Sequence, residues 1–202
     1  MTKRRPAVVV LAAGRGTRFR GPGHKLEQHL GDAPGTETLL ARSLHHALAT
    51  QLPVVVVTTP ALAPAVHQLV AARDIVTLAE RDAQGRPQPV GMGHSIAAGV
   101  SATGDADGWL ILPADMPLVR PATILAVAQG LERFPVCYAQ YRGIQGHPVG
   151  FGTELYSELT DLRGDEGAKR IVARYAAQPI EVDDPGVHID VDTAEDLARL
   201  RR

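Results

Sequence analysis

The sequence predicts an α/β fold, a three-layer α/β/α sandwich around a mostly parallel sheet. Short apolar runs rich in valine, at residues 8–12 and 53–58, are typical of strands buried on both faces. Segments with helical spacing of leucine and alanine follow these runs, as at residues 37–50. Strands that alternate with helices favour parallel pairing, with the helices on both faces of the sheet.

The remaining elements follow in chain order. Further strands are expected at residues 74–78, 108–112 and 135–141, and a two-residue alternation predicts one more at 189–192. Further helices are expected at residues 61–73, 96–100, 121–134, 153–159 and about 163–175, and a last one is capped by Thr193. Residues 80–90 hold glycine and prolines without a hydrophobic period, which predicts a loop.

Length and composition favour one domain over residues 1–202 and exclude several classes of protein. The net charge is −1 without a block of like charges, which argues against nucleic acid or a membrane surface as the main partner. The first apolar run is too short for a membrane span or a signal peptide. The single cysteine, Cys137, excludes an internal disulfide and fits a reducing compartment, so we expect a cytoplasmic protein.

The stretch after the first strand predicts a loop that holds a polyphosphate. Small residues let the backbone turn sharply and approach a ligand closely, and successive N–H groups of such a turn form an anion-binding nest. Arginine and lysine side chains nearby suit phosphate. The loop residues are Leu11, Ala12, Ala13, Gly14, Gly16 and Thr17, and the cations are Arg15, Arg18 and Lys25.

Two other phosphate loops fit less well. A P-loop requires glycine before its lysine and serine or threonine after it, whereas Lys25 stands between His24 and Leu26. A dinucleotide fingerprint requires a third glycine after Gly16 and an acidic residue after the second strand, where Thr58 stands instead. The remaining alternative is a solvated βα turn with scattered charges.

Three further segments contain candidate binding residues. Gly93 and Ser95 lie where a glycine-rich loop enters a helix, a place that suits a negative ligand, although Ser95 could simply cap that helix. Asp115 follows the strand at 108–112, at the edge where open sheets bind ligands and where a carboxylate can hold Mg²⁺; it could also cap the next helix. Asp190 and Asp192 are either functional carboxylates or a solvated pair at a strand end.

The segment from Leu11 to Lys25 resembles the signature of nucleotidyltransferases that couple an NTP to a phosphorylated acceptor. It is most similar to the molybdenum cofactor cytidylyl- and guanylyltransferases. The segments Gly-Met-x-x-Ser at 91–95, Asp-Met-Pro at 115–117, Gly-His-Pro at 146–148 and Asp-x-Asp-Thr at 190–193 match the same family in the same order. The resemblance implies a Rossmann-like sheet of the nucleotide-diphospho-sugar transferase type.

The resemblance also implies a reaction, in which an NTP and a molybdopterin-type cofactor give the dinucleotide form of the cofactor and pyrophosphate. Gly93 and Ser95 would then help to hold the nucleotide, and His147 would lie on the acceptor side. Asp115 would bind the catalytic Mg²⁺, and Asp190 or Asp192 would add a second contact. A molybdoenzyme would receive the product. The sequence shows no nucleophilic triad or dyad, which fits direct attack by the acceptor phosphate on the α-phosphorus.

Two departures from the family's usual pattern matter. The stretch between Arg18 and Lys25 is longer than the usual Arg-Met-Gly spacing, which bears on the register of the lysine. Ala12-Ala13-Gly14 resembles the cytidylyl branch, where the methyl group of Ala13 would narrow the base pocket and favour CTP over GTP. Four alternatives stay open: GTP with the same cofactor, another phosphorylated acceptor, a non-catalytic chaperone of the cofactor, and a nicotinamide-dependent oxidoreductase, which the missing glycine disfavours.

Overall fold

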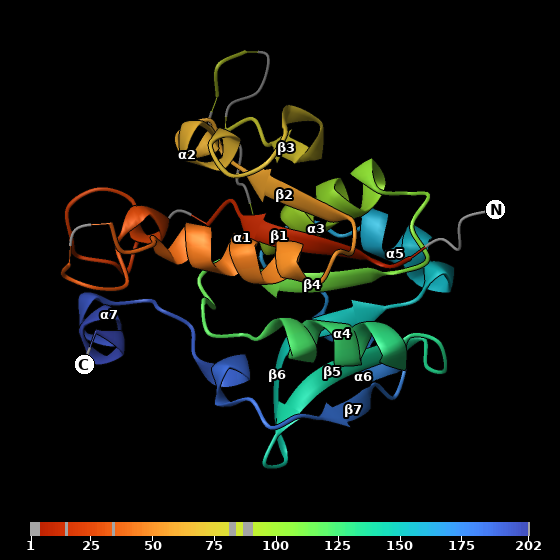
Figure 1. Cartoon of the computed structure of the whole chain (residues 1–202). Helices are drawn as coiled ribbons and strands as arrows, with labels where there is room; N and C mark the ends of the chain where they lie inside the picture. Colours follow the sequence, from red (N-terminus) through yellow and green to blue (C-terminus); the bar gives the residue numbers. More distant parts are fainter. Residues whose placement is uncertain (1–4, 15, 34, 81–83, 87–90, 202) are drawn as a thin grey trace.

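A computed structural model describes residues 5–14, 16–33, 35–80, 84–86 and 91–201. These residues form one seven-stranded sheet with the order β3-β2-β1-β4-β6-β5-β7 (Figure 1). The strands are β1 (Ala7–Ala12), β2 (Val54–Thr58), β3 (Ile75–Thr77), β4 (Trp109–Pro113), β5 (Val136–Tyr141), β6 (Ile144–Phe151) and β7 (Gln178–Glu181).

The sheet is mostly parallel, as the sequence predicts. β1 pairs in parallel with both β2 and β4, so that Val9 lies beside Val55 on one side and Ile111 on the other. β2 with β3 and β5 with β7 are also parallel pairs, whereas β6 is antiparallel to both of its neighbours. The carboxyl ends of β1 and β4 therefore meet at one edge of the sheet.

Helices cover both faces of the sheet, which confirms the three-layer sandwich. They are α1 (Leu39–Ala49), α2 (Ala63–His67), α3 (Met92–Ala102), α4 (Pro121–Gly130), α5 (Tyr156–Thr160), α6 (Lys169–Arg174) and α7 (Ala194–Leu200). α1 and α4 lie in front of the sheet in Figure 1, and α3 lies behind it. Side chains of β1 alternate accordingly: Val8 and Val10 pack in the cluster that contains Leu44 of α1, and Val9 packs in the cluster that contains Ile96 of α3.

One predicted strand is wrong, and two strands were not predicted. Residues 144–151, for which the sequence predicts no helix or strand, form β6, because a tight turn with positive φ at Arg142 and Gly143 returns the chain along β5. Residues 178–181 form β7, which was not predicted. Residues 189–192 are not a strand: they connect a 3₁₀ turn (Pro185–His188) to α7.

Several helix boundaries also differ from expectation. α3 begins at Met92, four residues before the predicted start, because Gly91 is its N-cap. α2 ends at His67 and a separate 3₁₀ turn occupies Ala72–Asp74, so the predicted helix at 61–73 is divided. α4 ends at Gly130, four residues before the predicted end at 134.

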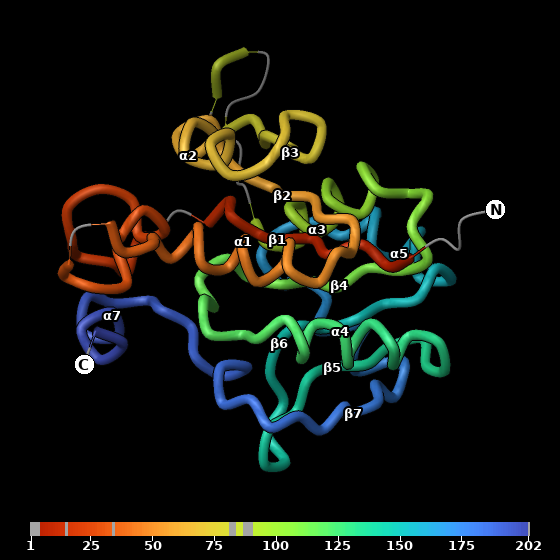
Figure 2. The backbone as a smooth tube through the Cα atoms, in the orientation of Figure 1, coloured from red at the N-terminus to blue at the C-terminus, as the bar shows by residue number. Residues whose placement is uncertain are grey.

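The last helix lies beside the long segment that follows the first loop (Figure 2). Arg201 donates to the carbonyl of His29 at 2.7 Å and forms an ion pair with Asp32 at 3.0 Å. Thr193 caps α7, as predicted, through a capping box with Asp196. These contacts hold the chain just before α7, including Asp192, near the end of β1. In the part of the chain that is described, no helix has the length and apolar character needed to cross a membrane.

Candidate active site

The loops that follow β1 and β4 leave the sheet side by side. The N–H group of Ala114 donates to the carbonyl of Leu11 at 3.0 Å, which joins the two loops directly. Asp115 comes next in the chain, two residues after the end of β4. The structure thus places this carboxylate at the edge of the sheet where ligands bind in open α/β folds.

Lys25 connects the first loop to two carboxylates from distant parts of the chain. Its Nζ lies 2.8 Å from Oδ2 of Asp115 and 3.0 Å from Oδ1 of Asp192. The residue is 8% exposed, so the ammonium is largely shielded from water. Arg18, which is exposed, contacts the other oxygen of Asp192 at 2.8 Å. Four residues predicted from three separate motifs therefore form one cluster: Arg18, Lys25, Asp115 and Asp192.

The charges of this cluster act on one another. Burial alone would lower the pKa of Lys25, but the Asp115 and Asp192 carboxylates raise it above its ordinary value, so the lysine is charged. Burial alone would raise the pKa of Asp192, but its hydrogen bond and ion pair with Lys25 lower it. Burial, a hydrogen bond with Asp192 and the nearby negative charges raise the pKa of Asp190. Asp192 is thus the more acidic carboxyl of the pair.

One oxygen of the cluster fits a metal ligand. Oδ1 of Asp115 is buried and accepts no hydrogen bond from any described residue, an arrangement that is costly unless a cation or water binds there. In the described ranges no group of three or more Asp, Glu, His or Cys side chains is arranged as a metal site. The predicted trio of Asp115, Asp190 and Asp192 is therefore not a ready ligand set, because the ammonium of Lys25 lies between two of its members.

The glycine-rich loop has the features expected of an anion nest. Ala12 and Ala13 are buried, whereas Gly14 and Thr17 are exposed. No described residue accepts a hydrogen bond from the N–H groups of Gly14, Gly16 or Thr17. Gly16 has a φ of +56° and an added Cβ would lie 3.2 Å from Cβ of Lys25, so glycine is needed where the loop passes the lysine. Arg15, predicted as a catalytic cation, lies outside the described residues.

Gly93 and Ser95 have contacts that explain them within the fold. An added Cβ on Gly93 would lie 2.7 Å from the carbonyl oxygen of Arg163, and the N–H group of Gly93 donates to the Gly164 carbonyl at 2.8 Å. The hydroxyl of Ser95 is buried and donates to the Gly91 carbonyl at 3.2 Å, one turn earlier in α3. Ser95 is therefore not the N-cap of this helix. The Gly-Met-Gly stretch allows the segment around 163–165 to pack against the start of α3.

His147 lies on β6, directly after Gly146, whose backbone passes close to Val187. An added Cβ on Gly146 would lie 2.4 Å from the carbonyl oxygen of Val187, so a larger residue could not occupy this position. Burial lowers the pKa of His147, and the charge of Asp115 acts in the opposite direction. The imidazole is therefore neutral near pH 7 and within electrostatic range of Asp115.

Two contacts that position Asp115 were missed by the sequence analysis. The buried hydroxyl of Ser43, on α1, donates to the carbonyl of Ala114 at 2.7 Å. The N–H group of Val191 donates to the carbonyl of Asp115 at 2.9 Å. A serine among the apolar positions Leu39, Leu40 and Leu44 of a helix was a signal that could have been used. Nothing in the sequence pattern indicates the contact with Val191.

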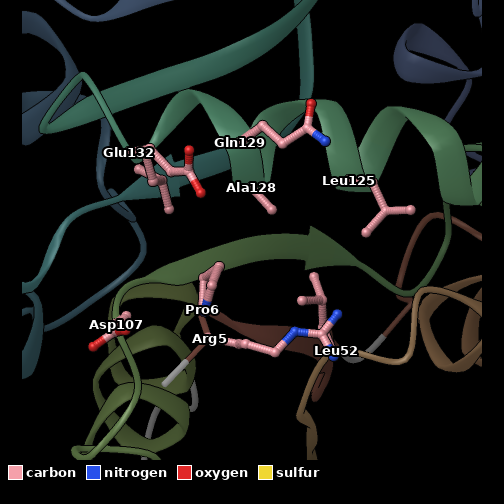
Figure 3. A pocket seen from close by; sticks show the side chains of 9 residues that line it. Arg5, Pro6, Leu52, Asp107, Leu125, Ala128, Gln129 and Glu132 are labelled. Atoms are coloured by element: carbon pink, nitrogen blue, oxygen red, sulfur yellow. The ribbon is translucent and has the colours of Figure 1, made fainter. Parts of the chain in front are cut away.

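A cavity of about 440 Å³ lies at the opposite edge of the sheet (Figure 3). Arg5 and Pro6 precede β1, and Asp107 precedes β4, so they border the amino ends of these strands. The lining is completed by Leu52, by the last turns of α4, and by Leu131 and Glu132, which follow α4. This cavity is therefore separate from the cluster around Lys25.

Comparisons with known proteins agree with this geometry. A family model described as the MobA-like NTP transferase domain matches residues 8–179. The purine catabolism protein PucB of Bacillus subtilis (strain 168) is 34% identical in an alignment of 118 positions, which covers 55% of this chain and 57% of PucB. The bifunctional protein GlmU of Halorhodospira halophila is 31% identical in an alignment of 204 positions, which covers 96% of this chain and 37% of GlmU. The chain thus spans 57% and 37% of these two curated relatives.

Solved structures share the fold over nearly the whole chain. Rv0371c from Mycobacterium tuberculosis H37Rv has a TM-score of 0.77 at 24% sequence identity. The structure of its complex with manganese has a TM-score of 0.73 at 25% sequence identity, and both alignments cover 97% of each chain. Molybdopterin-guanine dinucleotide biosynthesis protein A from Archaeoglobus fulgidus has a TM-score of 0.69 at 17% identity and covers 96% of each chain. With the family model matched from Val8 onward and the predicted cluster assembled at the sheet edge, the chain belongs to the MobA-like NTP transferase domain family of nucleotidyltransferases.

Proposed function

We propose that the protein transfers a nucleoside monophosphate, with CMP favoured, from an NTP to a phosphorylated molybdopterin cofactor and releases pyrophosphate with Mg²⁺ as the cofactor. The observation that carries this proposal is the cluster in which Lys25 lies 2.8 Å from Asp115, beside a glycine-rich loop with open N–H groups. This arrangement offers cations and amides to a triphosphate and a carboxylate to a divalent cation, which are the groups that nucleotidyl transfer requires.

Each residue then has a distinct task. The N–H groups of the loop at 13–17 bind the triphosphate, and Lys25 with Arg18 and Arg15 neutralises its charge. Asp115 would hold Mg²⁺, with a further contact from Asp190 or Asp192. When bound, the cation offsets the charge that develops as pyrophosphate leaves. His147 lies on the acceptor side, where a neutral imidazole can donate a hydrogen bond to the acceptor phosphate.

Two relatives support parts of this proposal. The structure of Rv0371C was solved as a complex with manganese, a divalent cation that oxygen ligands bind much as they bind magnesium. The Archaeoglobus protein is described as a molybdopterin-guanine dinucleotide biosynthesis protein, which supports the acceptor class. The product would pass to a molybdoenzyme. A cytoplasmic location belongs to the proposal and is supported by the single cysteine.

The preference for CMP rests on Ala13. Its methyl group is buried against the α3 face of the core, directly before the exposed Gly14. We expect the methyl to fix the path of the loop at the base pocket, so that a pyrimidine is favoured. Ala13→Gly should reduce the ratio of kcat/KM for CTP to that for GTP. An unchanged ratio would remove the argument for CMP while leaving the reaction class untouched.

The decisive assay measures pyrophosphate release from CTP, GTP, ATP and UTP in the presence of Mg²⁺ and molybdopterin. We expect release with CTP that depends on both Mg²⁺ and the acceptor. Asp115→Asn should lower the rate by roughly a hundredfold or more, because a metal contact contributes several kcal/mol to the transition state. Asp183→Asn, at an exposed aspartate away from the cluster, is the control and should leave the rate unchanged.

Other outcomes distinguish the alternatives. Pyrophosphate release with GTP alone would support the same reaction, with GTP and not CTP as the nucleotide substrate. Release that requires a different phosphorylated molecule would change the acceptor. Binding of molybdopterin without pyrophosphate release from any NTP would refute the proposal and favour a chaperone of the cofactor.

A further inference from the structure

The ion pairs of Lys25 connect two ligands that the site must bind. The same ammonium that would neutralise a triphosphate is held at 2.8 Å by Asp115 and at 3.0 Å by Asp192. These carboxylates are the groups that would hold a divalent cation. We propose that Lys25 is a counter-ion that divalent metal and NTP displace together, so that the two ligands bind cooperatively. The inference rests on the proposed function, because it assigns an order to the binding steps of that site.

Burial makes the displacement costly when metal comes alone. The side chain of Lys25 is 9% exposed, and those of Asp115 and Asp192 are 23% and 17% exposed. A cation that takes the carboxylate oxygens leaves an ammonium without a partner in a place that water barely reaches. An unpaired buried charge is strongly destabilising. Metal alone should therefore bind weakly.

The glycine-rich loop removes this cost when nucleotide is present. Gly16 brings the loop within 3.2 Å of Cβ of Lys25, measured from the position that an added Cβ would have on the glycine. A triphosphate bound to the open N–H groups of Gly14 and Thr17 would thus lie close to the lysine stem. The ammonium can then exchange carboxylate oxygens for phosphate oxygens, and the freed carboxylates can take the cation. Each ligand removes the obstacle to the other.

The exchange predicts a reciprocal coupling between the two ligands. By linkage, NTP must strengthen metal binding by the same factor by which metal strengthens NTP binding, and such factors are typically about 5–150. Arg18 offers a matched comparison within the cluster. It also pairs with Asp192, at 2.8 Å, but its side chain is 76% exposed and it does not pair with Asp115 in the described structure. Losing Arg18 removes one positive charge without freeing the Asp115 carboxylate from its ion pair with Lys25.

The test is a Mn²⁺ titration followed by electron paramagnetic resonance of the free ion, with and without a non-hydrolysable CTP analogue. For the wild type we expect weak Mn²⁺ binding alone and roughly 5–150-fold tighter binding with the analogue. Lys25→Met keeps the apolar stem and removes the charge. It should bind Mn²⁺ more tightly than the wild type without nucleotide, by roughly tenfold, and its coupling factor should fall clearly below that of the wild type, to the part that direct contact between the cation and the phosphates supplies. Arg18→Met should show a clearly smaller gain in nucleotide-free affinity.

Two results would overturn the inference. The first is that the wild type and Lys25→Met bind Mn²⁺ with equal affinity when no nucleotide is present. The second is that Lys25→Met and Arg18→Met gain the same Mn²⁺ affinity over the wild type, which would indicate a general effect of removing one positive charge. Lys25→Gln provides a second neutral variant if Lys25→Met does not fold. The nucleotide-free titration does not depend on turnover. If the protein releases pyrophosphate but Lys25→Met gains no Mn²⁺ affinity, only the counter-ion role of Lys25 is refuted. Absence of pyrophosphate release with the expected titration would refute only the proposed reaction.

Discussion

Asp184 should be among the residues on which the fold depends most, and Asp184→Ala tests this. The residue is 2% exposed, and its carboxylate accepts three hydrogen bonds. The N–H group of Arg120 and the hydroxyl of Thr123 donate to Oδ2 at 2.9 and 2.6 Å, and the N–H group of Gly186 donates to Oδ1 at 3.0 Å. α4 has no cap from its own N-cap side chain, so Asp184 caps it from 64 residues away.

The expected cost follows from the groups left without acceptors. Thr123 and Gly186 are buried, and each unsatisfied buried donor costs about 1–3 kcal/mol. Loss of the helix cap adds about 0.5–2 kcal/mol. Removing a buried carboxylate offsets part of this sum. We therefore expect a loss of about 3 kcal/mol in the free energy of unfolding, or a fall in Tm of roughly 6–12 °C for a chain of this size.

Urea unfolding followed by fluorescence of Trp109 measures this loss. The chain has one tryptophan, and Trp109 is 1% exposed on the central strand β4, so its emission reports the core. Asp183→Ala is the matched control: it removes the neighbouring, exposed carboxylate and should change stability by less than about 0.5 kcal/mol. If Asp184→Ala unfolds within 1 kcal/mol of the wild type, the hydrogen bonds do not stabilise α4 as argued.

Three further predictions concern other parts of the fold. Gly146→Ala should destabilise the protein by about 1–3 kcal/mol in the same urea assay, because the new Cβ would lie 2.4 Å from the Val187 carbonyl oxygen; an unchanged midpoint would contradict this. Burial raises the pKa of the Cys137 thiol to about 12, so at pH 8 only about one thiol in ten thousand is ionised, and mass spectrometry should find it unalkylated by iodoacetamide until urea is added. Thr193→Ala should cost about 0.5–2 kcal/mol, because its hydroxyl accepts the Asp196 N–H at 3.1 Å; thermal unfolding by circular dichroism should show a loss absent from Glu195→Ala.

The central strands were predictable because their sequence admits few other states. Val8, Val9 and Val10 are all fully buried, and the alternate residues pack against helices on opposite faces. A run that is apolar at every position is typical of a parallel strand covered on both sides. The same logic located Asp115, since the residue after such a strand lies at the ligand-binding edge whatever helices surround it.

The outer strands were not predictable because their state depends on their neighbours. β6 contains Gly146, His147 and Pro148, which have no strand period, yet it pairs with β4 on one side and β5 on the other. At 189–192 the alternation is real, since Val191 is fully buried while Asp190 is exposed. The N–H group of Val191, however, donates to the carbonyl of Asp115 and not to a neighbouring strand. An extended segment that is buried on one side shows alternating apolar and polar residues whether or not it joins a sheet.

The pairing of Lys25 with both carboxylates could not be predicted for a related reason. The lysine lies 90 residues from Asp115 and 167 from Asp192 along the chain. Their approach depends on two main-chain hydrogen bonds, from Ala114 to the Leu11 carbonyl and from Val191 to the Asp115 carbonyl. Neither bond requires a particular side chain. Because backbone contacts position both carboxylates, we expect them to keep their places when the charge of Lys25 is removed, as the proposed exchange of carboxylate for phosphate at one ammonium requires.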